Sequence, residues 1–549
     1  MRILFKTLLL LLIIESAVSC RKKLDLAPSD QFSSETFWTS EQNVMLALTG
    51  VYRGKIQMAS NPTGAEFAPS DWWSYYGMIF LELPTDNLYD RRGDNSAFNT
   101  MTNGALTSSN GHIANYWTLS YARIARCHDF LENIDKAPLD PAEISRMTAE
   151  ARFIRACQYF YLSQFFGSVP LVQKSLTLKE ANTVTKSKKE EILAFTESEF
   201  NAIIPLLPRQ SLMSSSDRGR ATQQAALAFL GRTYLGQQKW VEAAATYKQI
   251  IDMNDNIIDP NFESLFDGTN ETSKEIIFAA QFSQDLAPNA MMQHDYPAIL
   301  GGYVLPCPLS SLVESFEFND GTPFSYADPR YNAADVGQNR DPRLRYTVLY
   351  NNRPFKNIIY VSHPDSSRSA DQLTLTKQAT RTGYAIKKFN SEAFTGGDLQ
   401  NSGVDLPVIR YAEVLLSYLE AKLEAGDAID QTLLDATINK VRGRASVNMP
   451  KVTVTDPADL RTILRRERRN ELALEGIRYW DLLRWKNIGQ ILNGDFYGAA
   501  FPGAINLRKK GTAADPYSRW YVTSKAFRIG QDELWPVPQS EVNINPQLK

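Results

Sequence analysis

Cysteine and histidine are scarce in this chain of 549 residues, which contains four of each. The cysteines form no CxxC pair, and an odd number remains once Cys20 is set aside, so neither a disulfide framework nor a zinc site is expected. The histidines form no HxxxH or HExxH cluster, so we predict no metal site, and the sequence indicates no other cofactor. The residues concerned are Cys127, Cys157, Cys307, His112, His128, His294 and His363.

An excess of charge of one sign is also lacking, because 59 basic residues stand against 61 acidic ones. No long basic stripe alternates with aromatic residues, so a nucleic acid is not expected as a partner. The sequence has no GxSxG motif, no catalytic Cys/His pair and no phosphate-cradling glycine loop. A glycosidase needs only two carboxylates at a suitable separation. Nothing else indicates catalysis, however, and we expect a protein that is not an enzyme.

Long apolar runs are absent except at the N-terminus. There, the basic residues Arg2 and Lys6 precede an apolar run at 8–14, and small residues then lead into Cys20, which is the order of a signal peptide. The run is far shorter than the roughly 20 residues of a membrane-spanning helix. Because a cysteine at the cleavage point resembles a lipobox, we expect removal of 1–19 and an anchoring lipid on Cys20. The alternative is an ordinary signal peptide followed by a coincidental cysteine.

Helical periodicity dominates the chain after this N-terminal segment, and a hydrophobic fraction of 43% is ample for a large core. A first helix is expected after Ser40, which can cap it. The unit at 220–252 resembles a tetratricopeptide helix pair, in which small residues let two antiparallel helices approach and large ones fill the gap, and Trp240 lies at its turn. The positions that follow this pattern are Leu227, Gly231, Tyr234, Ala243, Tyr247 and Ile250. The other predicted helices cover 114–135, 142–166, 188–207, 412–425, 431–444 and 456–485. The periodicity therefore indicates a largely helical scaffold, with one tetratricopeptide-like pair at 220–252 and a further helix pair at 412–425 and 431–444.

Irregular segments interrupt this scaffold. Residues 53–112 are rich in Gly, Asn, Asp and aromatics, and we interpret them as a long loop that binds ligand, because long loops in compact proteins are usually functional. Isolated strands are expected at 275–282 and 346–350. The predicted division is one domain at 20–549, with a scaffold at about 35–253 and 406–490, the ligand loop at 53–112, an irregular subdomain at 254–405 and a loop-rich tail at 491–549.

The densest aromatic cluster lies at 71–76 and contains Trp72 and Trp73. An aromatic ring can cover the apolar C–H face of a sugar, while Asp, Asn and Arg side chains bind its hydroxyls. Alternation is expected to bury one tryptophan and expose the other, unless both simply anchor the loop to the helices. The polar candidates that come shortly after the cluster are Asp86, Asn87, Arg92 and Asn95.

An arginine-rich run at 465–469 could form a phosphate or nucleic-acid patch. However, Glu467, Glu471 and Glu475 recur at a spacing of four. Pairing between positions i and i+4 can absorb much of this charge, and we favour that structural interpretation. Paired arginines can also cross-link helices through bidentate contacts.

Many short motifs, in order along essentially the whole chain, resemble the SusD/RagB family of outer-membrane lipoproteins. The most specific are AEARFIRA at 149–156, continuing to FGSVPL at 166–171, and RERRNEL at 466–472, continuing to EGIRYWDL at 475–482. The others are LD at 24–25, FW at 37–38, GRA at 219–221, DPR at 341–343, RYAEV at 410–414, NKVR at 439–442, LWPVP at 534–538 and NP at 545–546.

This resemblance implies a mainly α fold, in which tetratricopeptide-like helix pairs form a scaffold and the irregular subdomain lies against it. The resemblance also implies a non-catalytic binding lipoprotein on the cell outer membrane, facing the exterior. It would capture a nutrient, a glycan or oligosaccharide, and deliver it to a SusC-like TonB-dependent transporter, over which it acts as a lid. The basic residues at 21–23 depart from the acidic ones often found there in exported members. The RagB branch handles peptides, so a peptide is the alternative ligand. A tetratricopeptide-type scaffold without a small ligand is a third possibility, in which 71–76 would be buried.

In this family, ligand contacts commonly come from the loop region and from the later irregular subdomain. The resemblance therefore adds Tyr75 to the candidates and places it, with Arg92 and Asn95, first among them. The weaker candidates that it implies in the irregular subdomain are Tyr296, Tyr303 and Tyr326.

Overall fold

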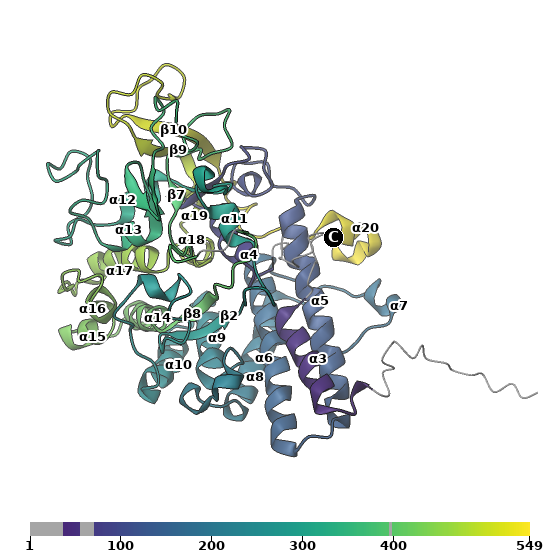
Figure 1. The fold of residues 1–549 in the computed structure, drawn as a ribbon. Coiled ribbons are helices and arrows are strands. Elements are labelled where there is room, and N and C mark those ends of the chain that lie inside the picture. Colours follow the sequence, from purple (N-terminus) through teal and green to yellow (C-terminus); the bar gives the residue numbers. More distant parts are fainter. Residues whose placement is uncertain (1–36, 55–70, 395–397) are drawn as a thin grey trace, which may run out of the picture.

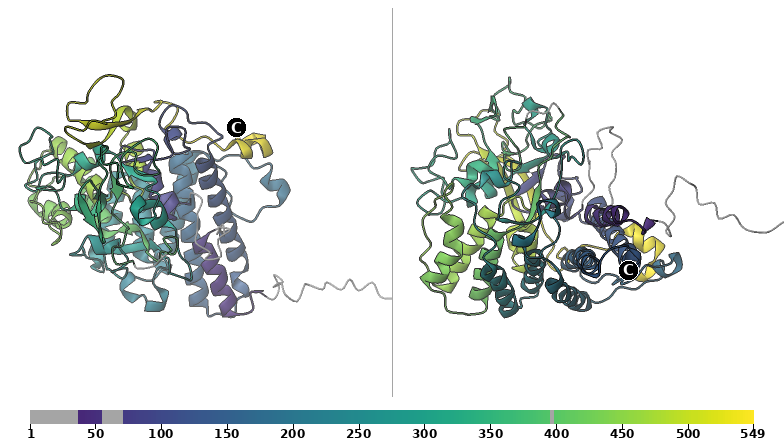
Figure 2. Two further views of the ribbon diagram at one scale, coloured as in Figure 1. Left: turned by 45° about the horizontal axis from the view of Figure 1, so that its top comes forward. Right: turned by 60° about the horizontal axis from the view of Figure 1, so that its bottom comes forward.

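The computed structural model describes residues 37–54, 71–394 and 398–549. The expected signal peptide and Cys20 lie outside these ranges. Within them, no helix is both long and apolar enough to cross a membrane. The long helices lie together in the lower and right part of Figure 1, whereas loops and short strands occupy the upper left. The two turned views agree with this division (Figure 2).

The predicted helices of the first half are all present, with the expected start signals. Ser40 accepts a hydrogen bond from the Asn43 amide at the start of the first one, and Asp140 caps a helix whose first residue is Pro141. The long helices are α3 (Glu41–Arg53), α5 (Gly111–Asn133), α6 (Pro141–Phe165), α8 (Lys189–Ile203), α9 (Gln223–Gly236) and α10 (Trp240–Met253). The short ones are α4 (Tyr75–Met78) and α7 (Leu178–Ala181).

Helices α9 and α10 form the helix pair that the tetratricopeptide-like pattern predicts. A Cβ atom on Gly231 would lie 2.5 Å from the ring of Tyr247, so only glycine allows the two helices to approach this closely. Trp240 begins α10, as expected, and packs half-buried against the core.

The scaffold continues through a segment much later in the chain, because α10 packs against α14 (Tyr411–Glu424), which in turn packs against α17 (Pro457–Glu471). The helix predicted at 431–444 is split into α15 (Gln431–Ala436) and α16 (Ile438–Arg442), since Thr437 has a non-helical backbone. Residues 456–485 form a pair, α17 and α18 (Arg478–Arg484). The remaining short helices are α11 (Met291–Asp295), α12 (Ser310–Ser315), α13 (Arg343–Thr347), α19 (Ile488–Ile491) and α20 (Gln539–Ile544).

The strands of the described residues pair as antiparallel two-stranded sheets. The expected strands at 275–282 and 346–350 are confirmed as β2 and β4, and the tail at 491–549, predicted to be loop-rich, also holds the longest strands, β9 and β10. The pairs are β1 (Leu88–Asp90) with β3 (Pro306–Pro308), β2 (Ile276–Ala280) with β8 (Leu406–Arg410), β4 (Val348–Leu349) with β7 (Ala385–Ile386), β5 (Arg353–Phe355) with β6 (Ile358–Tyr360), and β9 (Asn493–Ala500) with β10 (Arg519–Ala526).

A buried ionic network joins α17 to the irregular segments. The carboxylate of Glu471 lies between the guanidinium groups of Arg343, Arg410 and Arg444, at nitrogen–oxygen distances of 3.0, 3.0 and 2.8 Å. The predicted i,i+4 pairing is wrong: each ion pair that residues 465–469 make within the described chain reaches another segment. The predicted cross-linking by arginine is confirmed, and it fixes the irregular part on the scaffold.

Candidate functional site

Both tryptophans of the 71–76 cluster are buried, with exposed fractions of 3% for Trp72 and 5% for Trp73. Trp72 stacks within 4.2 to 6.0 Å of four aromatic rings and donates a hydrogen bond to the Ser120 hydroxyl. Trp73 lies under the guanidinium group of Arg123. The expectation that one of them is exposed is therefore wrong, and both anchor the segment to the helices.

The polar candidates Asp86 and Asn87 are buried as well. Asp86 forms a bidentate pair with Arg478, at 2.9 Å for each bond, and a second pair with Arg469. Burial alone would raise the pKa of Asp86, but the two guanidinium groups outweigh burial and hold this pKa far below its usual range. The Asn87 amide bonds to Glu82 and Arg469. These side chains hold α17 and α18 in place, and a ligand cannot reach them without displacing those partners.

Two of the predicted tyrosines also lie in the interior. Tyr75 is fully buried, and its hydroxyl forms a hydrogen bond of 3.1 Å with Nδ1 of His294. Tyr296 donates to the Ser391 carbonyl and packs edge-on against Phe355. The long loop predicted at 53–112 is thus, over its described part at 71–112, mostly a buried layer of short elements.

A solvent-facing surface forms where the predicted loop meets the segment after α11. We define the Tyr76 surface as Tyr76, Arg92, Asn95, His112 and Tyr303. Arg92 is 41% exposed, makes a bidentate pair with Asp90 and donates to the Tyr76 hydroxyl at 3.0 Å. Asn95 is exposed in the same turn, and Tyr303 is 38% exposed.

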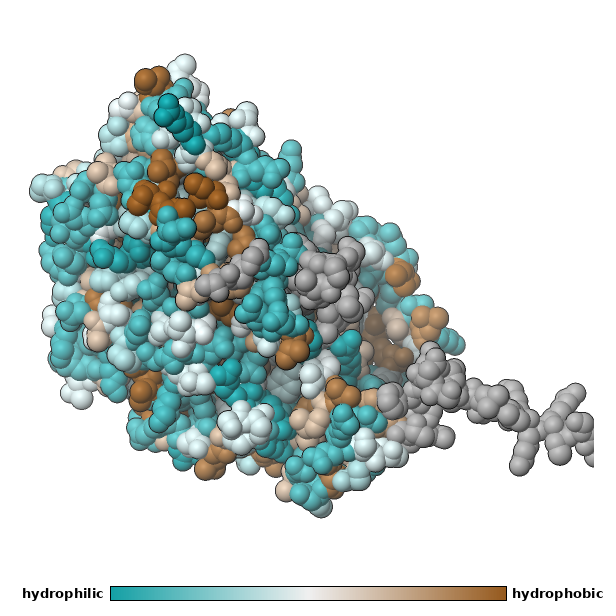
Figure 3. Space-filling model, viewed as in Figure 1, coloured by the Kyte–Doolittle hydropathy of each residue, from teal (hydrophilic) through white to brown (hydrophobic). Residues whose placement is uncertain are grey.

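Aromatic contacts link the three rings of this surface, in part through the buried His294. The Tyr76 ring lies 5.5 Å from His112 and 5.8 Å from the buried His294, which Tyr303 also approaches edge-on at 5.8 Å. Figure 3 shows a compact apolar patch on the upper left of the molecule, in the region where Figure 1 labels β7 and β9, but the Tyr, His, Arg and Asn residues of the Tyr76 surface are not hydrophobic on this scale and do not form it. The surface therefore combines half-exposed rings with hydrogen-bonding groups.

The Tyr76 surface carries little net charge. Burial, with the positive charge of Arg92 nearby, lowers the pKa of His112 to about 4. Burial likewise lowers the pKa of His294 to about 4. Both rings are therefore neutral at pH 7, and the charge of Arg92 is balanced by Asp90. Such a surface suits an uncharged ligand that offers hydroxyls and apolar ring faces.

Tyr326 belongs to a second aromatic group. Its ring stacks on the exposed Tyr517 at 4.7 Å, and its hydroxyl donates to Glu314. Strand β10 links this group to the Arg92 turn, because Arg519 at the start of β10 lies 5.7 Å from the Tyr326 ring, and Thr523 donates to Asp94.

Sequence reasoning missed Tyr76, His112 and Tyr517. Tyr76 lies in the aromatic cluster at 71–76, but adjacent positions on the short helix α4 point in different directions, and the sequence pattern does not show which one faces solvent. Within the described ranges, no group of three or more His, Cys, Asp or Glu side chains could hold a metal ion.

Comparison with known proteins identifies the family. The model of the SusD family matches residues 274–549, and a second model, described as starch-binding and associating with the outer membrane, matches residues 64–235. A crystal structure of a SusD-like carbohydrate-binding protein from Bacteroides fragilis is 46% identical, covers 94% of this chain and 100% of that one, and superposes with a TM-score of 0.90. The chain belongs to the SusD family.

Curated SusD relatives match along nearly the whole length. A SusD-like protein from Bacteroides ovatus is 22% identical over 96% of this chain and 93% of its own. The starch-binding protein SusD of Bacteroides thetaiotaomicron is 23% identical over 99% of this chain and 97% of its own. Proteins of the SusD family are non-catalytic binding proteins, and the mainly helical SusD-like fold predicted from the sequence is confirmed.

Proposed function

We propose that this protein captures a glycan or oligosaccharide at the cell surface and delivers it to a SusC-like TonB-dependent transporter in the outer membrane. The 46% identical relative is a SusD-like carbohydrate-binding protein. The single observation that carries the proposal within this chain is the Tyr76 surface, where half-exposed rings adjoin Arg92 and the exposed Asn95 lies in the same turn as Arg92.

An alternative without a small ligand requires 71–76 to be buried, and residues 71–75 meet that requirement. The exposed Tyr303 and Arg92 are what distinguish the glycan proposal from it. An aromatic ring that covers a sugar face and is lost to alanine typically reduces binding by about 2 kcal/mol at the centre of an interface.

Tyr303→Ala is accordingly expected to weaken glycan binding roughly 30-fold, because 1.4 kcal/mol corresponds to a factor of ten. The form starting after Cys20 is first screened against polysaccharides by affinity electrophoresis, and the retained glycan is then titrated by calorimetry. Leu178→Ala, a change at an exposed apolar residue on α7, is the matched control and should bind like the unchanged protein.

Retention of no glycan by the unchanged protein would contradict the proposed ligand. Unchanged affinity in Tyr303→Ala would exclude the Tyr76 surface as the site. In that case, loss of binding in Tyr517→Ala would assign the ligand to the second aromatic group.

Anchoring is proposed through a lipid on Cys20. Cys20→Ala is expected to move the protein from the membrane fraction to the soluble fraction, because one lipidated cysteine is its only predicted membrane attachment. Cell fractionation with immunoblotting measures this, with Cys307→Ala as the control. Unchanged membrane retention of the Cys20 variant would refute the anchor.

A further inference from the structure

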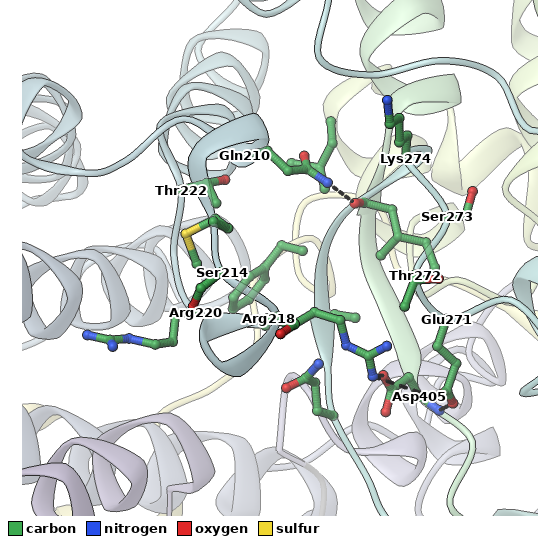
Figure 4. A pocket seen from close by; sticks show the side chains of 18 of the residues that line it. Gln210, Ser214, Arg218, Arg220, Thr222, Glu271, Thr272, Ser273, Lys274 and Asp405 are labelled. Atoms are coloured by element: carbon green, nitrogen blue, oxygen red, sulfur yellow. Dashed lines mark hydrogen bonds and ion pairs between the residues drawn. The ribbon is translucent and has the colours of Figure 1, made fainter.

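A cavity of about 740 Å³ opens between the loop at 210–222 and strand β2. Figure 4 shows that its side chains come from the loop, from residues 271–274 and from Asp405 at the approach to β8. Its volume lies within the range of about 300 to 1,000 Å³ that is usual for ligand sites. It shares no residue with the Tyr76 surface, so it is a separate place on the molecule.

The backbone of β2 forms one wall of this cavity. Four consecutive residues at 276–279 line it, and the pairing of β2 with β8 is irregular over the same residues. The Ile276 carbonyl accepts a hydrogen bond from the cavity residue Gln210, so the cavity reaches the main chain of the strand. The ring of Phe278 packs in the core against Trp73 and Phe153 at 5.3 and 5.4 Å, which leaves its backbone to face the cavity.

The edge of β2 away from β8 has no strand partner within the described residues. At one end, the side-chain amide of Gln210 donates to the Ile276 carbonyl at 2.8 Å (Figure 4), in place of a neighbouring strand. Open strand edges of this kind pair with an added extended segment through main-chain hydrogen bonds.

The charges at the other end of the cavity are incompletely paired. The guanidinium group of Arg218 lies 3.7 Å from the Glu271 carboxylate and 3.5 Å from that of Asp405. One cation thus faces two carboxylates. Burial, together with the negative charge of Glu271, raises the pKa of Asp405 to about 7, as expected where positive charge is lacking.

Other cations near the cavity do not correct this imbalance. Arg220 points away from the cavity in Figure 4 and pairs with Glu150 and Asp217. Lys274 lines the cavity, but its ammonium group points away from both carboxylates (Figure 4). A second positive charge, supplied by a ligand, would complete the pairing beside Asp405.

We propose that this cavity binds an extended peptide segment as an added strand on β2, with a basic side chain of the peptide beside Glu271 and Asp405. The five residues of β2 span about 16 Å, which matches a peptide of about five residues. A sugar fits less well, because the aromatic residue in the lining, Phe278, has its ring in the core.

Calorimetry with the form starting after Cys20 tests this proposal. The probe is a capped pentapeptide of alternating valine and threonine with a central lysine, compared with its glutamate analogue and with a version methylated at alternate backbone nitrogens. The lysine peptide is expected to bind at least ten times more tightly than the glutamate peptide. The methylated peptide is expected not to bind, because it cannot donate the main-chain hydrogen bonds.

Two variants locate the site. Asp405→Asn keeps an acceptor for the Phe282 amide and removes a charge that burial disfavours, so it should fold, lose about tenfold in affinity and lose the preference for lysine. Ser215→Trp, at an exposed position in the lining, should abolish peptide binding by filling the cavity. Glu424→Gln, far from the lining on α14, is the control.

Failure of the lysine peptide to bind, equal binding of the methylated peptide, or full affinity in both cavity variants would overturn the proposal. Glycan binding is measured on the same variants and should be unchanged in each. Loss of peptide binding with glycan binding intact would assign the peptide to the cavity alone. Loss of glycan binding with peptide binding intact would concern the Tyr76 surface alone.

Discussion

Glu471→Gln is expected to lower the free energy of unfolding by about 3–5 kcal/mol, the usual effect of removing one partner from a buried ionic network. The substitution preserves volume but leaves Arg343, Arg410 and Arg444 with one carboxylate fewer, and the side chains of all four residues are fully buried. Each arginine keeps another carboxylate partner, but the network gains one unit of positive charge that cannot reach water. Urea unfolding followed by circular dichroism measures the loss.

Glu424→Gln is the matched control for this change. Glu424 pairs with Arg461 at 2.7 Å, but the arginine side chain is 35% exposed, so water can replace the lost partner. The control is expected to cost no more than about 1 kcal/mol. Equal losses in the two variants would show that burial of the network does not determine its contribution.

The same network predicts acid sensitivity. Burial alone would raise the pKa of Glu471, but Arg444, Arg410 and Arg343 outweigh burial and hold this pKa below the ordinary value. Burial is likewise outweighed at Glu420, where Arg484 is the main cause of a pKa lowered to about 2. Because these pKa values are depressed in the folded state, their stabilisation is complete above about pH 4.3, the unfolded value, and is lost as the pH falls toward 2. The Glu471→Gln variant should lose less free energy of unfolding than the unchanged protein over this pH range.

Trp72→Ala is expected to lower the free energy of unfolding by about 3–5 kcal/mol, as is usual when a buried aromatic side chain is truncated. Trp72 stacks on Tyr116, Tyr161, Phe165 and Trp535, and its indole nitrogen donates to a buried hydroxyl at 2.7 Å. Truncation removes these contacts and leaves a cavity at the point where the C-terminal tail meets the helices. Thermal and urea unfolding measure the effect.

Tyr303→Ala serves as the comparison, because its exposed ring can be removed with a stability change within about 0.5 kcal/mol, as is usual at the surface. The two variants should therefore have opposite properties. Trp72→Ala would be less stable yet, below its unfolding transition, bind glycan normally, and Tyr303→Ala would be stable but bind weakly. A stable Trp72→Ala that has lost glycan binding would restore the role first predicted for this residue.

The sequence located the segments that form much of the candidate site, but it did not show which of their side chains face solvent. The turn with Arg92 and Asn95 and the segment with Tyr303 were both predicted, and the structure joins them through contacts of Tyr76 and Tyr303 with His294. Spacing gives no direction for side chains outside regular helices and strands. Tyr76 was therefore overlooked, while its neighbour Tyr75, which is buried, was preferred.

The sequence by itself determined the family, the positions of the long helices and the close α9–α10 approach, because these depend on local periodicity, caps and residue size. Only the tertiary structure decided which polar and aromatic side chains meet solvent. Trp535 stacks on Trp72 although it lies more than 400 positions later in the sequence. Arg469 and Arg478 form ion pairs with Asp86 across a sequence separation almost as large. Burial and pairing of this kind depend on packing between distant segments, which no local pattern encodes.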